Sequence, residues 1–98
     1  MNEYIVCIEL PSQLTDDFLA LIPAQRERVN ELLSSGILTT YSLSLDRSRV
    51  WTTVTAESME KVCETIDSFP LRSYMQVSIH PLAFHRAGTR AIHQLSLN

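Results

Sequence analysis

The polar side chains best placed to do chemistry in this sequence lie together on one helix. Apolar residues recur at helical spacing from Thr15 to Gly36, and Gln25 falls at the centre of the face that they form, with Arg26 at its border. A carboxamide there can donate hydrogen bonds to a ligand, and a guanidinium beside it can hold a carboxylate through two parallel bonds. The pattern predicts a pocket between this helix and a sheet that binds an anionic small molecule through Gln25 and Arg26.

Both residues also have a purely structural interpretation. A buried glutamine needs hydrogen-bond partners. Pro23 cannot donate within the helix and frees a carbonyl, such as that of Leu19, which the Gln25 amide would reach. Arg26 would then lie on a solvated helix flank. The sequence leaves the two interpretations open.

Few other residues carry chemistry. Tyr41 and Tyr74 fall in expected strands, where their hydroxyls either reach the same pocket or point to water. His80, His85 and His93 are five and eight residues apart, a spacing that suits neither a helix face nor a strand face. The chain has only two glycines and no cluster with metal-ligand spacing, so we expect no phosphate loop and no metal.

Two strand–helix–strand units follow one another in the first 80 residues and would position these side chains. The expected strands are Tyr4–Leu10, Ile37–Leu45, Val50–Val54 and Tyr74–Ile79. The order β-α-β-β-α-β predicts a ferredoxin-like α+β fold, with a four-stranded antiparallel sheet and both helices on one face. The other face needs a cover, which favours a homodimer or larger homo-oligomer.

The helix boundaries follow from capping residues. Thr15 or Ser12 is expected to cap the first helix, which either kinks at Pro23 or restarts there, and Thr55 is expected to cap the second. The second helix has an apolar stripe and ends at Pro70. The members of this stripe are Met59, Val62, Cys63, Ile66 and Phe69.

A hairpin turns at Asp46–Arg49, between the second and third strands. With Arg47-Ser48 as its loop, the facing pairs are Leu45 with Val50, Leu43 with Thr52, and Tyr41 with Val54. These six residues would pack against the helices. Trp51 would lie on the opposite, serine-rich face, where a large aromatic residue is typical of a wet interface.

Composition narrows the class of protein. The net charge is -3 with a single lysine, which argues against nucleic acid as a partner. No run approaches the ~20 apolar residues of a membrane span, and no signal peptide is visible. Cys7 and Cys63 have no metal spacing and are expected to be reduced, buried thiols of a cytoplasmic protein. We expect one domain over residues 1–85 and a tail over 86–98 that contacts a neighbouring subunit or frays.

The run from Ser58 to Met75 resembles the second helix and last strand of muconolactone isomerases. Pro70-Leu71-x-x-Tyr74-Met75 and Leu82-x-x-His85 match that family without gaps, and the correspondence extends from Gln25 to His85. The resemblance implies a cofactor-free dimeric α/β barrel, often built into larger rings. It also implies a proton shift that moves a double bond in a lactone bearing a carboxylate.

That reaction needs a base and a group that steadies the enolate. The family's acidic residue falls at Gln25, and a neutral amide can orient a ligand or donate to an oxyanion but cannot act as a base. Three functions therefore stay open. They are a cofactor-free isomerase of a small carboxylate or lactone with His85 or another group as base, a non-catalytic ligand-binding or oligomeric scaffold, and a cofactor-independent oxygenase that shares the barrel.

Overall fold

The computed structural model describes residues 1–86, so the tail expected over 86–98 lies outside the described residues except for Arg86. The elements run in the order expected from the sequence. They are β1 (Asn2–Glu9), α1 (Asp16–Ser35), β2 (Leu38–Leu43), β3 (Arg49–Ala56), α2 (Met59–Asp67), the short 3-10 helix η1 (Arg72–Tyr74) and β4 (Gln76–Pro81).

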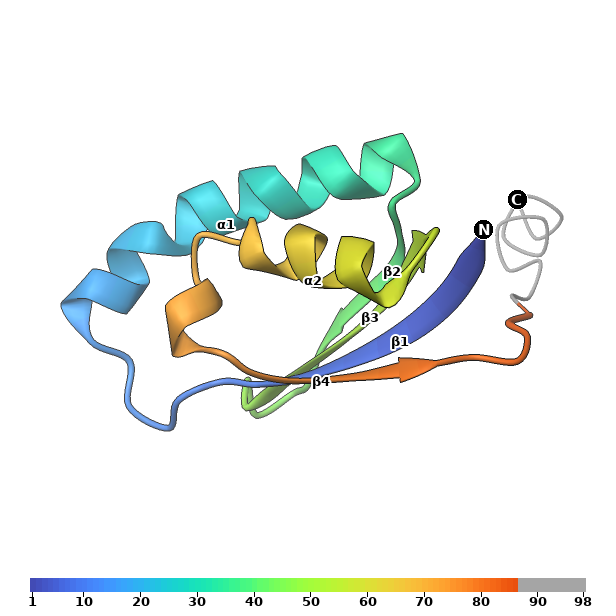
Figure 1. Ribbon diagram of the computed structural model, residues 1–98. Coiled ribbons are helices and arrows are strands. Elements are labelled where there is room, and N and C mark those ends of the chain that lie inside the picture. The colour runs from blue at the N-terminus through green and yellow to red at the C-terminus, as the bar shows by residue number, and fades with distance from the viewer. Residues whose placement is uncertain (87–98) are drawn as a thin grey trace, which may run out of the picture.

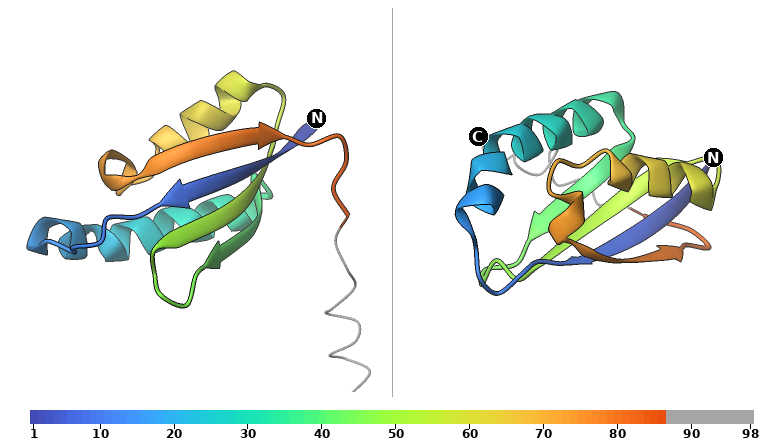
Figure 2. Two further views of the ribbon diagram at one scale, coloured as in Figure 1. Left: turned by 90° about the horizontal axis from the view of Figure 1, so that it is seen from below. Right: turned by 60° about the vertical axis from the view of Figure 1, so that its left-hand side comes forward.

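The strands form one four-stranded antiparallel sheet in the order β2-β3-β1-β4, which confirms the ferredoxin-like fold. Both helices lie on the same face of the sheet (Figure 1). The view from below shows the strands with the helices behind them (Figure 2, left). The described part of the chain therefore has two layers, and one face of its sheet has no helix over it.

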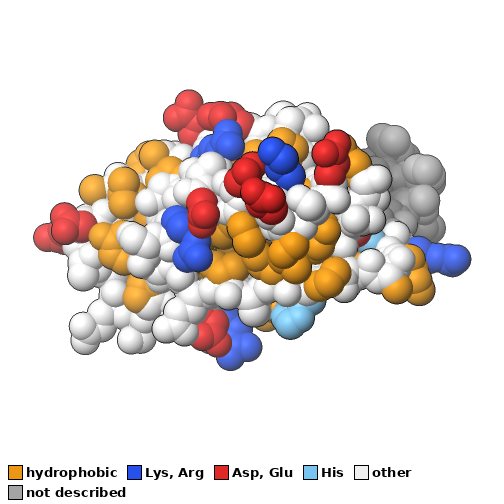
Figure 3. All heavy atoms as spheres, in the orientation of Figure 1, with side chains coloured by type: hydrophobic (Ala, Val, Ile, Leu, Met, Phe, Trp, Pro, Cys, Tyr) orange, Lys and Arg blue, Asp and Glu red, His pale blue; other side chains and the backbone are white. Residues whose placement is uncertain are grey.

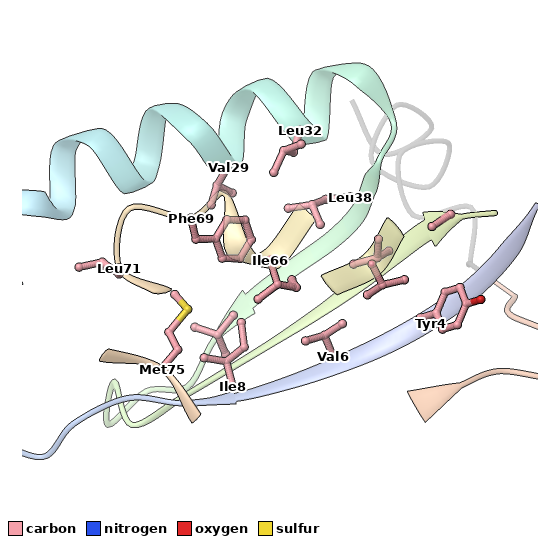
Figure 4. Packing of buried hydrophobic residues seen from close by; sticks show 14 of the residues in the cluster. Tyr4, Val6, Ile8, Val29, Leu32, Leu38, Ile66, Phe69, Leu71 and Met75 are labelled. Atoms are coloured by element: carbon pink, nitrogen blue, oxygen red, sulfur yellow. The ribbon is translucent and has the colours of Figure 1, made fainter. Parts of the chain in front are cut away.

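The core lies between these two layers. Alternate residues of β1, Tyr4, Val6 and Ile8, are buried against the helices, because successive side chains of a strand point to opposite faces. Figure 4 shows core residues from both layers, such as Val29 of α1 and Val6 of β1, projecting into the same interior. At ~25 cal/mol per Å² of apolar surface, burial of this cluster is the main force that fixes α1 over the sheet.

The first helix is continuous from Asp16 to Ser35, so it does not restart at Pro23. Of the two expected caps, Thr15 is the one used: its Oγ1 accepts a hydrogen bond from the Phe18 amide at 3.2 Å. Gly36 ends the helix in the left-handed conformation, with φ 81°, which a residue without Cβ adopts readily.

The expected cap of the second helix is wrong by three residues. Ser58, not Thr55, caps α2, and its side chain accepts from the Lys61 amide at 3.3 Å. Thr55 lies inside β3, which runs on to Ala56, and its hydroxyl donates to Glu3 Oε1. In the stripe of this helix, Val62, Ile66 and Phe69 are buried, but the marginal residues Met59 and Cys63 are exposed. Figure 3 shows hydrophobic side chains reaching the surface between α2 and β4.

The hairpin register expected from the sequence is also wrong, by two residues. Leu43, not Leu45, pairs with Val50, and Tyr41 pairs with Thr52. Leu45 stands fully exposed in the loop instead of packing against a helix. A shift of two residues keeps each remaining side chain on its expected face, since the side-chain period of a strand is two. The physical reason is the loop itself, in which Arg47 takes a left-handed conformation with φ 63°.

Tyr74 was expected on the last strand, and Trp51 was expected on the sheet face opposite the helices. Tyr74 belongs to η1 instead of β4, and its ring packs edge-on against Phe18 with centroids 5.3 Å apart. Trp51 lies in β3 on the face opposite the helices and is 39% exposed. A half-exposed tryptophan on that face is consistent with the interface proposed for it, which stays a prediction.

Candidate functional site

A cavity of about 190 Å³ opens at the end of the molecule where α1 begins, the β2–β3 hairpin turns and the segment after α2 passes beneath α1. Figure 2 (right) brings this end forward. The lining residues are Leu10, Leu14, Phe18, Ile22, Gln25, Arg26, Tyr41, Leu43, Arg47, Val50, Leu71 and Met75. An apolar concave wall with a few convergent polar groups is the usual form of a small-molecule site.

Gln25 lies in the wall of this cavity and is 5% exposed. Its Oε1 accepts a hydrogen bond from the Leu71 amide at 3.1 Å. That amide follows Pro70 in the turn after α2, and the side chain of Gln25 supplies the acceptor that a buried N–H requires. Gln25 thus ties α1 to the chain entering β4, a role different from the expected bond to a carbonyl freed at Pro23.

The other end of the same carboxamide has no such partner. Gln25 Nε2 is buried, and its contact with the Tyr41 hydroxyl, which opposes the rise in that hydroxyl's pKa, is too loose for a hydrogen bond of ordinary geometry; no other residue from 1 to 86 accepts from it. A buried donor without a good acceptor lowers the stability of the folded protein by about 1–3 kcal/mol. Such a donor in a cavity wall therefore favours a ligand that supplies an acceptor. A ligand oxygen placed beside Nε2 would remove that penalty.

Tyr41, on β2, lies beside Gln25 and lines the same cavity. Burial raises the pKa of the Tyr41 hydroxyl above its ordinary value of 10.0, and the Gln25 side chain opposes that rise only in part. The hydroxyl therefore stays protonated near neutral pH and can donate to a ligand oxygen. A shallower hollow of about 280 Å³ adjoins the cavity and shares Gln25, Arg26 and Tyr41 with it.

Two arginines stand at the rim. Arg26 is exposed and lines both the cavity and the adjoining hollow, as its place at the border of the apolar face predicts. Arg47 reaches the cavity from the hairpin loop and was missed by sequence reasoning, because the assumed register placed it in a tight two-residue turn. Neither forms an ion pair within residues 1–86, and the cavity lining contains no acidic side chain.

The remaining predicted site residues lie farther away. Tyr74 does not line the cavity but supports its wall by packing on Phe18. His85 is exposed and follows β4, whose last residue pairs with Tyr4 at the end of β1 remote from Leu10 and the cavity. Within one chain, the fold thus brings together Gln25, Arg26 and Tyr41 but not His85. The catalytic role assigned to His85 stays a prediction.

Other kinds of site find little support in the described part of the chain. Within residues 1–86, no group of three or more His, Cys, Asp or Glu side chains is placed to hold a metal ion. Cys7, on β1, and Cys63, on α2, are free, and Cys63 is exposed where a buried thiol was expected. No helix among these residues is long and apolar enough to cross a membrane.

The fold agrees with the comparisons with known proteins. A profile of the muconolactone delta-isomerase family matches residues 4–87, and the chain belongs to that family. A solved structure described as muconolactone isomerase superposes with a TM-score of 0.72 at 18% sequence identity, over 89% of this chain and 94% of that one. At this identity, the structural likeness establishes the fold alone. A search of curated proteins found no match.

Proposed function

We propose that this protein binds a small, largely apolar carboxylate or lactone in the cavity between α1 and the β2–β3 hairpin. The observation that carries the proposal is the buried Gln25 Nε2, a donor without a hydrogen bond of ordinary geometry in the wall of an apolar cavity. Gln25 and Tyr41 would donate to a carbonyl or lactone oxygen inside. Arg26 would hold the carboxylate at the rim, in water-exposed surroundings.

The same residues define what one chain would supply to a reaction. Two neutral donors pointed at one oxygen stabilise negative charge as it develops there, which is how an enolate is steadied. Proton abstraction needs a base, and none of the cavity-lining residues is a carboxylate or an imidazole. On this proposal the cavity binds and polarises its ligand, and a single chain isomerises it slowly or not at all.

The test is ligand-induced thermal stabilisation with a panel of lactones, monocarboxylates and dicarboxylates, muconolactone included. A ligand that binds only the folded state raises its apparent stability by mass action, whatever the chemistry. Arg26→Ala should weaken binding of a carboxylate about tenfold, or about 1.4 kcal/mol, since the guanidinium is at an exposed rim. Arg28→Ala is the matched control, because Arg28 lies on the same helix but pairs with Glu31. Equal losses in both variants would contradict the proposal.

Family membership supports a second candidate, a cofactor-free isomerase whose base comes from outside this cavity. His85 is the predicted base and lies on an exposed segment, where only another copy of the chain would carry it to the cavity. Muconolactone turnover followed by ultraviolet absorbance tests this candidate. A native protein with substantial turnover that His85→Ala abolishes would favour it over binding alone.

A further inference from the structure

A network of hydrogen bonds orders the β2–β3 loop around Arg47. Ser44 and Arg49 join the two strands through a backbone bond of 2.8 Å, and the Arg47 amide donates to the Ser44 carbonyl at 2.9 Å. Asp46 Oδ1 accepts from the Ser48 amide at 3.0 Å, from the Ser48 hydroxyl and from the Ser44 hydroxyl. These bonds hold the pKa of Asp46 down, to about 2, with the bonds from Ser48 as the largest cause.

This network holds Arg47 in a backbone conformation that is unfavourable for arginine. Its φ of 63° is in the left-handed region, where a Cβ crowds the neighbouring carbonyl oxygen. Hairpin loops that need this conformation usually contain glycine or asparagine. A strained residue that the surrounding loop fixes in place is a reason to look for a function.

The position of the side chain indicates what that function is. Arg47 lines the cavity from the hairpin, and Arg26 lines it from α1, so two cations share one rim. Although the whole chain carries a net charge of -3, the cavity lining has no acidic residue to offset them. Arg49, the first residue of β3, pairs with Glu9 at 3.5 Å and lines a hollow at the other face of the sheet.

We propose that Arg47 is the residue that makes the cavity select anionic ligands, and that the Ser44–Asp46–Ser48 network positions it for this purpose. This inference rests on the proposed function, because it assigns the ligand's charge requirement to one residue of the same cavity. Arg47 and Arg26 approach the ligand's anionic group from opposite elements. The apolar wall and Gln25 hold its body, which binds whether or not the ligand is charged.

The experiment compares sorbate, a small unsaturated carboxylate, with sorbamide, its uncharged amide of nearly the same shape. Titration calorimetry on the full chain should show sorbate binding more tightly than sorbamide. Arg47→Ala should lower sorbate affinity about five- to tenfold and leave sorbamide affinity unchanged, and Arg47→Lys should retain most of the preference. Arg47→Gly should behave like Arg47→Ala, since it relieves the backbone strain but also removes the charge. Circular dichroism and a thermal melt confirm folding of each variant.

Two further variants make the result decisive. Arg49→Ala removes an equal charge from the same hairpin and should leave the sorbate preference intact, so an equal loss in both variants would overturn the proposal. Asp46→Ala removes a negative charge near the rim, and simple electrostatics predicts tighter sorbate binding. The positioning role predicts weaker sorbate binding instead, and a gain in affinity would refute it.

The outcomes also separate this inference from the proposed function. Binding of sorbamide and sorbate with equal affinity by the native protein would overturn the role of Arg47 and leave the cavity as a ligand site. Binding of neither compound would overturn both.

Discussion

Replacing Gln25 with glutamate tests whether the cavity excludes water. The substitution keeps an oxygen to accept from the Leu71 amide at 3.1 Å and replaces the unpartnered donor Nε2 by a titratable oxygen. When protonated, the new carboxyl is close to isosteric with the carboxamide. When ionised, it places a charge at a position that is 5% exposed.

The magnitude follows from linkage. Desolvation raises the pKa of a buried carboxyl above the ordinary ~4.3, and a rise of roughly two units corresponds to about 2.7 kcal/mol. A raised folded-state pKa means that the folded protein binds the proton more tightly than the unfolded chain does. Stability is therefore complete below about pH 4.3 and falls as the pH rises through the folded-state pKa.

Urea unfolding of the native protein and Gln25→Glu from acid to neutral pH measures this directly. The two proteins should have similar stability in acid, and the variant should be less stable by roughly 2–3 kcal/mol at neutral pH. Gln13→Glu, at an exposed position, is the matched control and should show no such difference. A variant as stable as the native protein at neutral pH would refute a water-excluding site.

In muconolactone assays, the introduced base should raise turnover by about 10²–10⁴-fold over the native protein.

Three further predictions concern other parts of the molecule. Because burial raises the Tyr41 pKa, its contribution to stability should be complete below pH 10.0 and lost as the pH rises through the folded-state pKa; the difference between ultraviolet titrations of the native protein and Tyr41→Phe isolates its ionisation, and a Tyr41 that ionises at or below pH 10.0 would contradict this. Trp51→Asp should weaken self-association, because a symmetric contact places the new charge in the interface twice, and light scattering that finds the native protein monomeric at micromolar concentration would contradict the interface. Thr15→Ala should lower the free energy of unfolding by about 1 kcal/mol while Ser12→Ala has little effect, as measured by urea denaturation, and equal losses would argue against Thr15 as the cap.

Much of the fold follows from local patterns in the sequence. The apolar period of α1 placed Gln25 on the buried face, and Gly36 marked its end, because both features depend on residues within a few turns of each other. The order of strands and helices then fixed the sheet. The prediction of which hairpin side chains face the helices was also correct, since a register shift of two residues leaves the alternation of side chains unchanged.

What sequence reasoning missed depends on contacts or conformations without a local signal. The bond between Gln25 and the Leu71 amide joins residues 46 positions apart, and no spacing rule predicts it. Arg47 adopts a left-handed conformation, which glycine or asparagine at this position would have indicated in the sequence. Because arginine gives no such signal, neither the length of the loop nor the position of Arg47 at the rim was predicted. Of the candidate site, Gln25, Arg26 and Tyr41 were therefore predicted from the sequence, whereas Arg47 and the contact with Leu71 required the structure.

On the proposed function, Gln25 Nε2 gains a well-formed hydrogen bond only when a ligand oxygen enters the cavity. The most direct measurement is the side-chain amide signal of Gln25 in a nitrogen–proton correlation spectrum, assigned by its loss in Gln25→Glu. Titration with muconolactone or sorbate should shift this signal in the direction of a new hydrogen bond, together with signals from the cavity wall such as that of the Leu71 amide. A saturating ligand that leaves the Gln25 signal in place, while signals from the open face of the sheet move, would contradict the claim.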